Sequence, residues 1–173
     1  IFIAGTCFEY GSQNGKLSES SIEKPNNNYS LSKCMLKNYT FSLLKKFHFN
    51  LTWGRIFYIY GKHNSRATIY NQILESSKKK IKINVTGNLV RDYLYIDQIS
   101  KIIVALSIKN KNFGLVNICS GKGISLKKLV KNICKIEKIK ANVNYVKKMS
   151  NNLEPEKFWG CNKKLKICLK KNN

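Results

Sequence analysis

Short apolar runs alternate with amphipathic segments along the chain. The runs at Ile1–Ala4, Leu51–Tyr60 and Leu115–Cys119 predict strands of the kind that are buried on both faces of a parallel sheet. Between the first two, apolar side chains recur at four-residue spacing and predict a helix from Tyr29 to about Phe49, after a polar loop. The chain therefore begins with a strand, a helix and a second strand.

The same alternation continues to the end of the chain. Further helices are predicted over Arg66–Lys79, Gln98–Ile108, a segment starting after Ser125, and Asn162–Leu169, and further strands over Ile81–Thr86, Tyr93–Ile96 and Val143–Val146. Asp97 and Ser125 precede two of these helices and are expected to be their N-cap residues. Strands and helices that alternate at these lengths are typical of an α/β fold with a parallel sheet.

The charge changes this picture less than its size suggests. The 173 residues carry a formal net charge of +23, which would favour a nucleic-acid or acidic-membrane partner. However, 29 of the basic residues are lysine and only three are arginine, the residue whose planar fork binds phosphates and bases in pairs of hydrogen bonds. We interpret most of the charge as a solvated lysine surface and expect no nucleic-acid partner, although residues 130–173 hold 12 lysines and leave a basic face possible.

The spacing of the cysteines and the length of the apolar runs bear on metal binding, membrane association and cellular location. The six cysteines show no metal-binding spacing, so no metal is expected. The sequence shows no transmembrane segment and no signal peptide, so we expect no membrane association and a reducing, cytoplasmic location.

Tyr29 and Lys33 form the first candidate for chemistry. Their i, i+4 spacing at the start of a helix puts both side chains on one face. A neighbouring ammonium favours the phenolate, and moving the pKa of a tyrosine from ~10 to ~7 would need about 4 kcal/mol. Such a tyrosine could exchange protons with a substrate near neutral pH. Taken alone, the pair is better explained as an ordinary aromatic residue beside a solvated lysine, because tyrosine and lysine are abundant in this chain.

Other segments in a fixed order make the pair more specific. They are Gly5–Gly11 (GTCFEYG) before it, and Arg55–Gly61 (RIFYIYG), Arg91–Asp97 (RDYLYID), Asn117–Gly123 (NICSGKG) and Asn162–Lys166 (NKKLK) after it. With Tyr29 and Lys33, they resemble the extended short-chain dehydrogenase/reductase family, in particular its nucleotide-sugar epimerases, dehydratases and reductases. The resemblance implies the C-terminal part of a Rossmann-like, doubly wound parallel sheet with a small substrate-binding subdomain.

The resemblance also implies catalytic roles. Thr6 would hydrogen-bond the sugar oxygen that undergoes oxidation or reduction, unless it is only a capping hydroxyl at the strand end. Tyr29 would be the acid/base at that oxygen. Lys33 would bind the nicotinamide ribose and lower the pKa of Tyr29. The implied cofactor is NAD or NADP, and the implied substrate is a nucleotide-diphosphate sugar.

Four further positions are implied to bind the ligands. Arg91 matches an arginine that contacts the substrate diphosphate, with a surface arginine paired to Asp92 or Asp97 as the alternative. Phe57 and Tyr58 would lie near the nicotinamide, although many relatives have Asn where Tyr58 stands. Arg66 would reach the nucleotide, or else lie on a helix surface.

One difference from the family's sequence pattern limits the kinds of reaction that we expect. The sugar 4,6-dehydratases carry Asp-Glu, or at least Glu, directly after the catalytic Thr, where this chain has Cys7 and Phe8. Glu9 comes one position later and, on a continuing strand, would face the other way. We therefore expect an epimerase or a 4-keto-reductase that transfers hydride at sugar carbon 4, rather than a dehydratase.

A second departure concerns the cofactor loop. The fingerprint Gly-x-x-Gly-x-x-Gly, which lets the backbone approach a pyrophosphate, does not occur among the ten glycines. Because the chain also begins inside an apolar run, we expect it to be the C-terminal portion of a longer protein, inactive and a poor dinucleotide binder when isolated. Residues 1–80 would then form a partial Rossmann-like domain, and residues 81–173 mainly a substrate-binding subdomain into which residues 113–119 return a Rossmann strand.

Oligomeric state and two alternatives complete the expectations. By resemblance, the full-length protein would be a homodimer. The alternatives are a non-catalytic protein of the same fold that binds a nucleotide sugar or nucleic acid, and an inactive truncated remnant.

Overall fold

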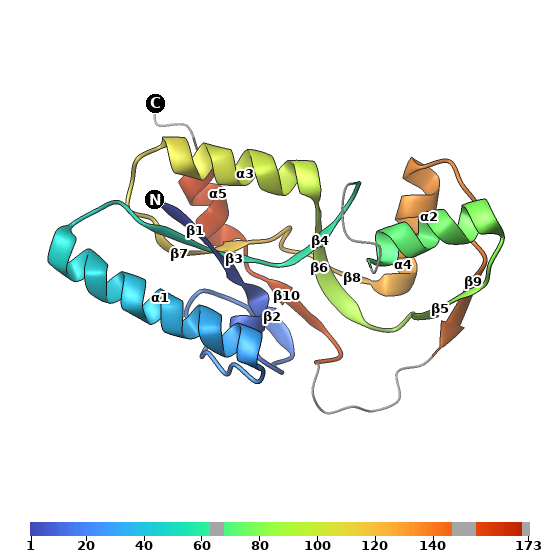
Figure 1. The fold of residues 1–173 in the computed structure, drawn as a ribbon, viewed down its shortest axis with the longest axis horizontal. Coiled ribbons are helices and arrows are strands. Elements are labelled where there is room, and N and C mark those ends of the chain that lie inside the picture. The colour runs from blue at the N-terminus through green and yellow to red at the C-terminus, as the bar shows by residue number, and fades with distance from the viewer. Residues whose placement is uncertain (63–67, 147–154, 171–173) are drawn as a thin grey trace.

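A three-stranded parallel sheet forms the centre of one half of the molecule (Figure 1). The computed structural model describes residues 1–62, 68–146 and 155–170. The strand order is β1 (Phe2–Thr6), β3 (Thr52–Ile56) and β7 (Gly114–Ile118). α1 (Asn28–Phe47) packs on one face, and α3 (Ile96–Ile108) on the other. This arrangement confirms the predicted α/β class with a parallel sheet.

The register of this sheet brings the ends of its strands together. Thr6 pairs with Ile56, and Ile56 pairs with Ile118, so the three carboxyl ends lie along one edge. Ligands of open α/β sheets bind outside the carboxyl ends of the strands. The edge that begins at Thr6 is therefore where a site is expected.

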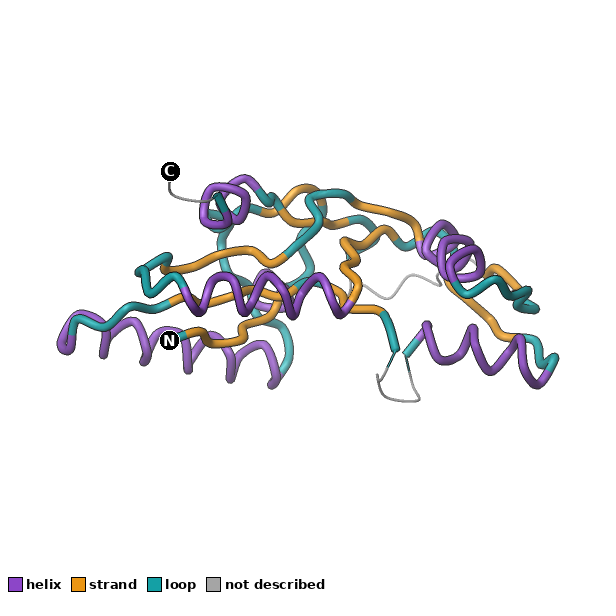
Figure 2. The backbone as a smooth tube through the Cα atoms, turned by 90° about the horizontal axis from the view of Figure 1, so that it is seen from above, coloured by secondary structure: helices purple, strands orange, loops and turns teal. Residues whose placement is uncertain are grey.

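The second half of the molecule is built from shorter strands and two helices. Its sheets are β4 (Tyr58–Tyr60), β6 (Val90–Tyr95) and β8 (Gly123–Ser125) in that order, and the pair β5 (Ile83–Thr86) with β9 (Val143–Val146). α2 (Ile69–Lys79) packs against α4 (Leu126–Ile136), with Tyr70, Ile73, Leu129 and Ile133 buried between them and β5. Figure 2 shows the two groups of helices at opposite ends of the molecule, with strands running between them.

The remaining elements join the two halves. They are η1 (a 3₁₀ helix, Cys7–Tyr10), β2 (Gly15–Leu17), β10 (Phe158–Gly160) and α5 (Lys163–Leu169). β10 pairs in parallel with β2 and also packs against β6. The segment 155–170 thus returns from the second half to the first.

The largest difference from the predicted elements lies at Phe57. The sequence predicts one strand over Leu51–Tyr60, but the chain leaves the central sheet after Ile56 and continues as β4, which pairs with β6. The N–H of Phe57 still donates to the carbonyl of Ile118 (3.1 Å), while its ring is buried in a separate aromatic cluster. The change of sheet at Phe57 carries Tyr58 out of the central sheet and toward the second half.

The two predicted helix N-caps, Ser125 and Asp97, have different outcomes. Ser125 caps α4 as predicted, because its Oγ accepts the N–H of Lys128 (3.2 Å). Asp97 does not cap α3, and this prediction is wrong: the helix begins at Ile96, two residues earlier than predicted, so Tyr95 is the N-cap. Asp97 lies in the first turn, where its negative charge interacts favourably with the helix dipole. Within the described residues, no helix has both the length and the apolar character needed to cross a membrane.

Candidate active site

Thr6 ends β1 at the carboxyl edge of the central sheet. Its side chain is nearly buried (5% exposed), and Oγ1 accepts the N–H of Phe8 at 3.3 Å as the N-cap of η1. The capping role considered from the sequence is therefore present. It uses one lone pair of the oxygen and leaves the hydroxyl proton able to donate to another group.

Tyr29 and Lys33 lie on the first turns of α1, and Lys33 contacts β1. Lys33 Nζ donates to the carbonyl of Ala4 in β1 (2.9 Å) and lies 5.9 Å from the centre of the Tyr29 ring. The Tyr29 side chain is 55% exposed. Asn27 fixes the start of the helix, because its Oδ1 accepts the N–H of Ser30 (2.9 Å). The structure thus brings Tyr29 and Lys33 together and anchors Lys33 two residues from Thr6.

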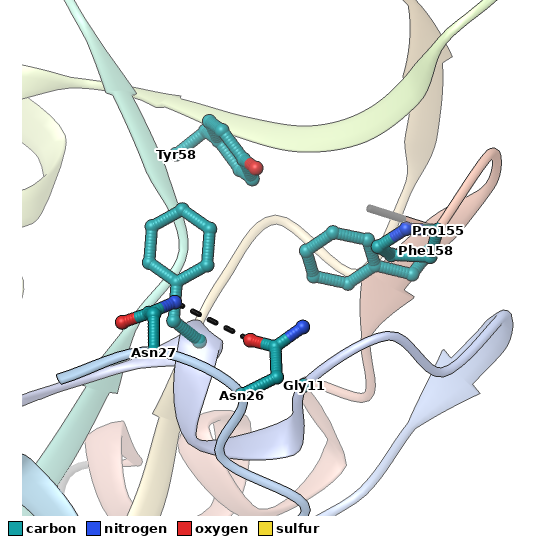
Figure 3. A pocket seen from close by; sticks show the side chains of 7 residues that line it. Gly11, Asn26, Asn27, Tyr58, Pro155 and Phe158 are labelled. Atoms are coloured by element: carbon teal, nitrogen blue, oxygen red, sulfur yellow. Dashed lines mark hydrogen bonds between the residues drawn. The ribbon is translucent and has the colours of Figure 1, made fainter. Parts of the chain in front are cut away.

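A pocket of about 200 Å³ lies at η1 and at the segment that precedes α1. It is lined by Phe8, Gly11, Asn26, Asn27, Tyr58, Pro155 and Phe158. Figure 3 shows Tyr58 and Phe158 across the pocket from Asn26 and Asn27, which are hydrogen-bonded to each other (3.3 Å). The pocket therefore has an aromatic side and a carboxamide side, and we call it the aromatic pocket.

A second pocket of about 340 Å³ shares Phe8 and Tyr58 with the first. Its other lining residues are Ile59, Thr68, Ile69, Leu89, Arg91, Tyr93 and Leu126. Tyr58 thus stands between the aromatic pocket and a pocket that contains Arg91.

Arg91 is buried rather than on the surface, so the surface alternative considered from the sequence is wrong. It is 2% exposed, and its Nη1 donates to the carbonyls of Val90 (2.9 Å) and Glu156 (3.0 Å). Its Nε donates to the Tyr58 hydroxyl (3.3 Å), and its guanidinium lies 5.0 Å from the centre of the Phe158 ring. These contacts hold the cation at the boundary between the two pockets.

Of the remaining candidate residues, Phe57 is buried and Arg66 is not described. Phe57 is 3% exposed and packs against the rings of Tyr10 and Phe158, with centroids 6.3 and 6.0 Å away. Arg66 lies outside the described residues.

A buried ion pair beneath Thr6 was missed by the sequence reasoning. Glu9 is fully buried; its Oε1 accepts the backbone N–H of Thr6 (2.8 Å) and the indole N–H of Trp53 (3.1 Å), and its Oε2 accepts from Nε of the buried Arg55 (2.7 Å). The expectation that Glu9 faces away along a strand is wrong, because η1 starts at Cys7 and turns the carboxylate back toward Thr6. The spacing Thr-x-x-Glu, a capping-box signature, was the signal that could have found it.

Glu23 extends this ion pair to α1. It forms salt bridges with Arg55 Nη2 and with Lys37 Nζ. Burial by itself would raise the pKa of Glu23, but the hydrogen bond from Lys37 and the charge of Arg55 outweigh it and lower the pKa. The loop before α1 is therefore tied to β3 and α1 by charge.

Replacing Glu23 with glutamine should weaken the dependence of stability on acid pH. A carboxylate whose pKa is lower in the folded state contributes its stability fully above the unfolded value of about 4.3 and loses it as pH falls through the folded value. Urea unfolding at pH 7 and pH 4 should therefore show a smaller drop in unfolding free energy for Glu23→Gln than for the wild type. Equal drops would contradict this role, and Glu75→Gln, at an exposed carboxylate, is the control.

Asp92 fixes the turn that follows β7. Its fully buried carboxylate accepts the N–H groups of Ser120 (2.7 Å), Gly121 (2.9 Å) and Gly160 (3.3 Å). Burial raises the pKa of Asp92, although these donors act in the opposite direction. Asp92 therefore joins β6, the turn at Ser120 and β10, the strand that supplies Phe158.

Comparison with known proteins gives one family. The model of the NAD dependent epimerase/dehydratase family matches residues 1–119. Two curated relatives come from Aggregatibacter actinomycetemcomitans: a dTDP-6-deoxy-L-talose 4-dehydrogenase (NAD(+)), 26% identical over 92% of this chain and 60% of its own length, and a GDP-6-deoxy-D-talose 4-dehydrogenase, 31% identical over 80% of this chain and 49% of its own length. The chain thus spans about half to three fifths of the length of these relatives.

A solved structure supports the same fold. The UDP-glucuronic acid 4-epimerase from Bacillus cereus, in complex with UDP-glucuronic acid and NAD, superposes with a TM-score of 0.81 at 23% identity, over 97% of this chain and 54% of its own. The expected partial Rossmann-like fold and the expected resemblance are therefore confirmed.

Proposed function

Because this chain belongs to the NAD dependent epimerase/dehydratase family, we propose that the complete protein in which it occurs is an NAD- or NADP-dependent nucleotide-sugar epimerase or 4-keto-reductase. The observation that carries the proposal is the hydrogen bond from Lys33 to the carbonyl of Ala4, which ties the Tyr29–Lys33 pair to β1, the strand that ends at Thr6. The two curated relatives are 4-dehydrogenases of nucleotide sugars, which supports chemistry at carbon 4.

The chain's own groups fit a nicotinamide dinucleotide at this edge. Lys33 offers an ammonium and the exposed Tyr29 a phenol, which are donors suited to ribose hydroxyls. The bound nicotinamide would accept hydride from sugar carbon 4 or return it. Tyr29 would take up or release the proton of the oxygen on that carbon, and Thr6 would orient that oxygen by donating its hydroxyl proton. Lys33 would hold Tyr29 in place and bind the cofactor.

The second half of the molecule would hold the rest of the substrate. Arg91 lines the second pocket, so we propose that its guanidinium contacts the diphosphate. Tyr58 would flank the nicotinamide and the sugar, Phe57 would support Tyr58 from the buried cluster behind it, and Arg66 would reach the nucleotide. In this proposal, residues 1–80 carry the catalytic side chains and residues 81–173 mainly bind the substrate. β4 and α2, although they belong to residues 1–80, pack against elements of residues 81–173.

A homodimer is proposed from the exposed face of α1. Leu31, Met35 and Tyr39 are 49, 65 and 64% exposed and follow one another at four-residue spacing. Sedimentation equilibrium of the complete protein should give a dimer, and Met35→Asp should shift it toward monomer. A monomeric wild type would contradict the proposal.

The six cysteines bear on the compartment. All are free thiols, and four of them are buried. Free thiols are typical of a reducing compartment, which supports the proposal of a cytoplasmic enzyme.

One assay tests the reaction. The complete protein, mixed with NAD(H) or NADP(H) and members of a panel of 4-keto and 4-hydroxy nucleotide sugars, should either change nicotinamide absorbance or convert a sugar into its carbon-4 epimer. A lasting change in nicotinamide absorbance, with the hydride now in the sugar product, indicates a reductase. Inversion of configuration at carbon 4 without a net absorbance change indicates an epimerase. If no member is reduced, oxidised or inverted, the protein is a binding protein or an inactive remnant.

A further inference from the structure

The ring of Tyr58 is held by rings from three other elements. Tyr58 is the first residue of β4, where it pairs with Tyr93 of β6, and the centroids of these two rings are 5.6 Å apart. Its centroid is also 5.8 Å from that of Phe8 in η1 and 6.0 Å from that of Phe158 in β10. Rings at these separations attract one another. The position of the Tyr58 hydroxyl is therefore set by the packing of its ring.

Neutral acceptors orient the guanidinium of the buried Arg91. Its Nε donates to the Tyr58 hydroxyl (3.3 Å), and its Nη1 donates to the carbonyls of Val90 (2.9 Å) and Glu156 (3.0 Å). Because a guanidinium is rigid and planar, acceptors on two of its nitrogens fix the plane in which it lies. The hydroxyl and the two carbonyls carry no formal charge, so they orient the cation without cancelling it. Of these three acceptors, the Tyr58 hydroxyl is the one that a substitution can remove.

Tyr58 also lies where the two pockets meet. It lines the aromatic pocket and the second pocket, and Arg91 lines the second. A ligand that extends from one pocket into the other lies beside Tyr58 and can reach Arg91. A nucleotide-diphosphate sugar has this form, because its diphosphate joins the sugar to the nucleoside.

We propose that Tyr58 is a positioning residue for Arg91: its hydroxyl holds the guanidinium in the orientation in which it binds the substrate diphosphate. This inference rests on the proposed function, which assigns the diphosphate to Arg91. A hydrogen bond to a charged group contributes more than one between neutral groups, so loss of the hydroxyl releases one end of the guanidinium. A guanidinium that turns out of its plane presents its N–H groups to the phosphate oxygens in poorer geometry. Tyr58 thus acts on diphosphate binding through Arg91, in addition to the contact of its ring with the ligands.

The test compares Tyr58→Phe with the wild type in the complete protein. This substitution keeps the ring and removes only the hydroxyl. UDP, dTDP and GDP are the probes, because they carry the diphosphate without the sugar, and each is titrated by calorimetry in the presence of saturating nicotinamide dinucleotide. The variant should bind the nucleoside diphosphate that the wild type prefers about 10-fold more weakly. With the best substrate of the panel, KM should rise by a similar factor and kcat should change less.

Two further variants show whether the loss acts through Arg91. Tyr60→Phe removes a hydroxyl from the same strand, from a ring that packs against Tyr70 and Tyr95, and should bind the nucleoside diphosphate as the wild type does. Arg91→Lys keeps a positive charge but has no Nε. In that background, Tyr58→Phe should cost much less affinity than it does beside arginine.

Each outcome separates the positioning role from the function. Unchanged affinity in Tyr58→Phe overturns the role, and this comparison decides even if the Arg91→Lys protein does not fold. Equal costs beside arginine and lysine also overturn it, because the hydroxyl then acts independently of the guanidinium. A wild type that binds none of the three nucleoside diphosphates overturns this inference together with the diphosphate contact of Arg91. Failure to convert any nucleotide sugar despite such binding overturns the proposed reaction alone.

Discussion

Replacing Tyr29 with phenylalanine should lower the turnover of the complete protein by about 10²-fold or more. The substitution removes only the hydroxyl, from a side chain that is 55% exposed and that forms the second residue of a capped helix. The ring and its 5.9 Å contact with Lys33 can stay in place, so dinucleotide affinity should change little. Turnover is measured with the best substrate of the panel, by nicotinamide absorbance for a reductase or by the amount of inverted sugar for an epimerase. Affinity is measured by calorimetric titration with NAD(H).

Tyr39→Phe is the matched control for this experiment. Tyr39 lies on the same helix and is similarly exposed (64%), but it is ten residues further from the carboxyl edge of the sheet. Its turnover should equal that of the wild type. Full activity of Tyr29→Phe would remove Tyr29 from the acid/base role, and equal losses in both variants would point to an effect on α1 as a whole.

Local patterns were enough to predict most elements of the fold, whereas the catalytic candidates were identified from the resemblance of several motifs to a known family. Apolar runs give buried strands, and the ends of β1 and α1 follow from side chains that act within a few residues. The pairing of Tyr29 with Lys33 follows from helix geometry alone, and the structure contains it.

What could not be predicted depends on contacts between distant segments. The run Leu51–Tyr60 has the pattern of one strand, and only the pairing of β4 with β6 separates Tyr58 from the central sheet. The burial of Arg91 requires the carbonyl of Glu156, which is 65 residues away. The aromatic pocket likewise combines Phe8 with Phe158, so its existence is a property of the folded chain.

Replacing Glu9 with glutamine should destabilise the protein by about 3–5 kcal/mol, the cost of leaving a buried charge without its partner. Both Glu9 and Arg55 have fully buried side chains, and the Glu9 carboxylate accepts from three donors: Thr6 N, Trp53 Nε1 and Arg55 Nε. A carboxamide places an NH₂ group where one oxygen was, so at least one donor then faces another donor. Glu23 still contacts Arg55 from the other side, but it is partly exposed and shared with Lys37. Urea unfolding of the protein at pH 7 measures the change.

Two further variants show whether this loss comes from the ion pair. Glu75→Gln removes a carboxylate whose contact with Lys79 is exposed and 4.0 Å long, so it should change the unfolding free energy by about 0.5 kcal/mol or less. Removing the cation together with the anion, in Glu9→Gln/Arg55→Met, should cost less than the sum of the two single changes by about 0.5–3 kcal/mol, because the uncompensated charge is then absent. Strictly additive losses would mean that Glu9 stabilises the fold through Thr6 and Trp53 alone. A double-mutant loss of unfolding free energy smaller than the sum of the single losses would show that the Glu9–Arg55 ion pair itself stabilises the fold around the end of β1 at Thr6.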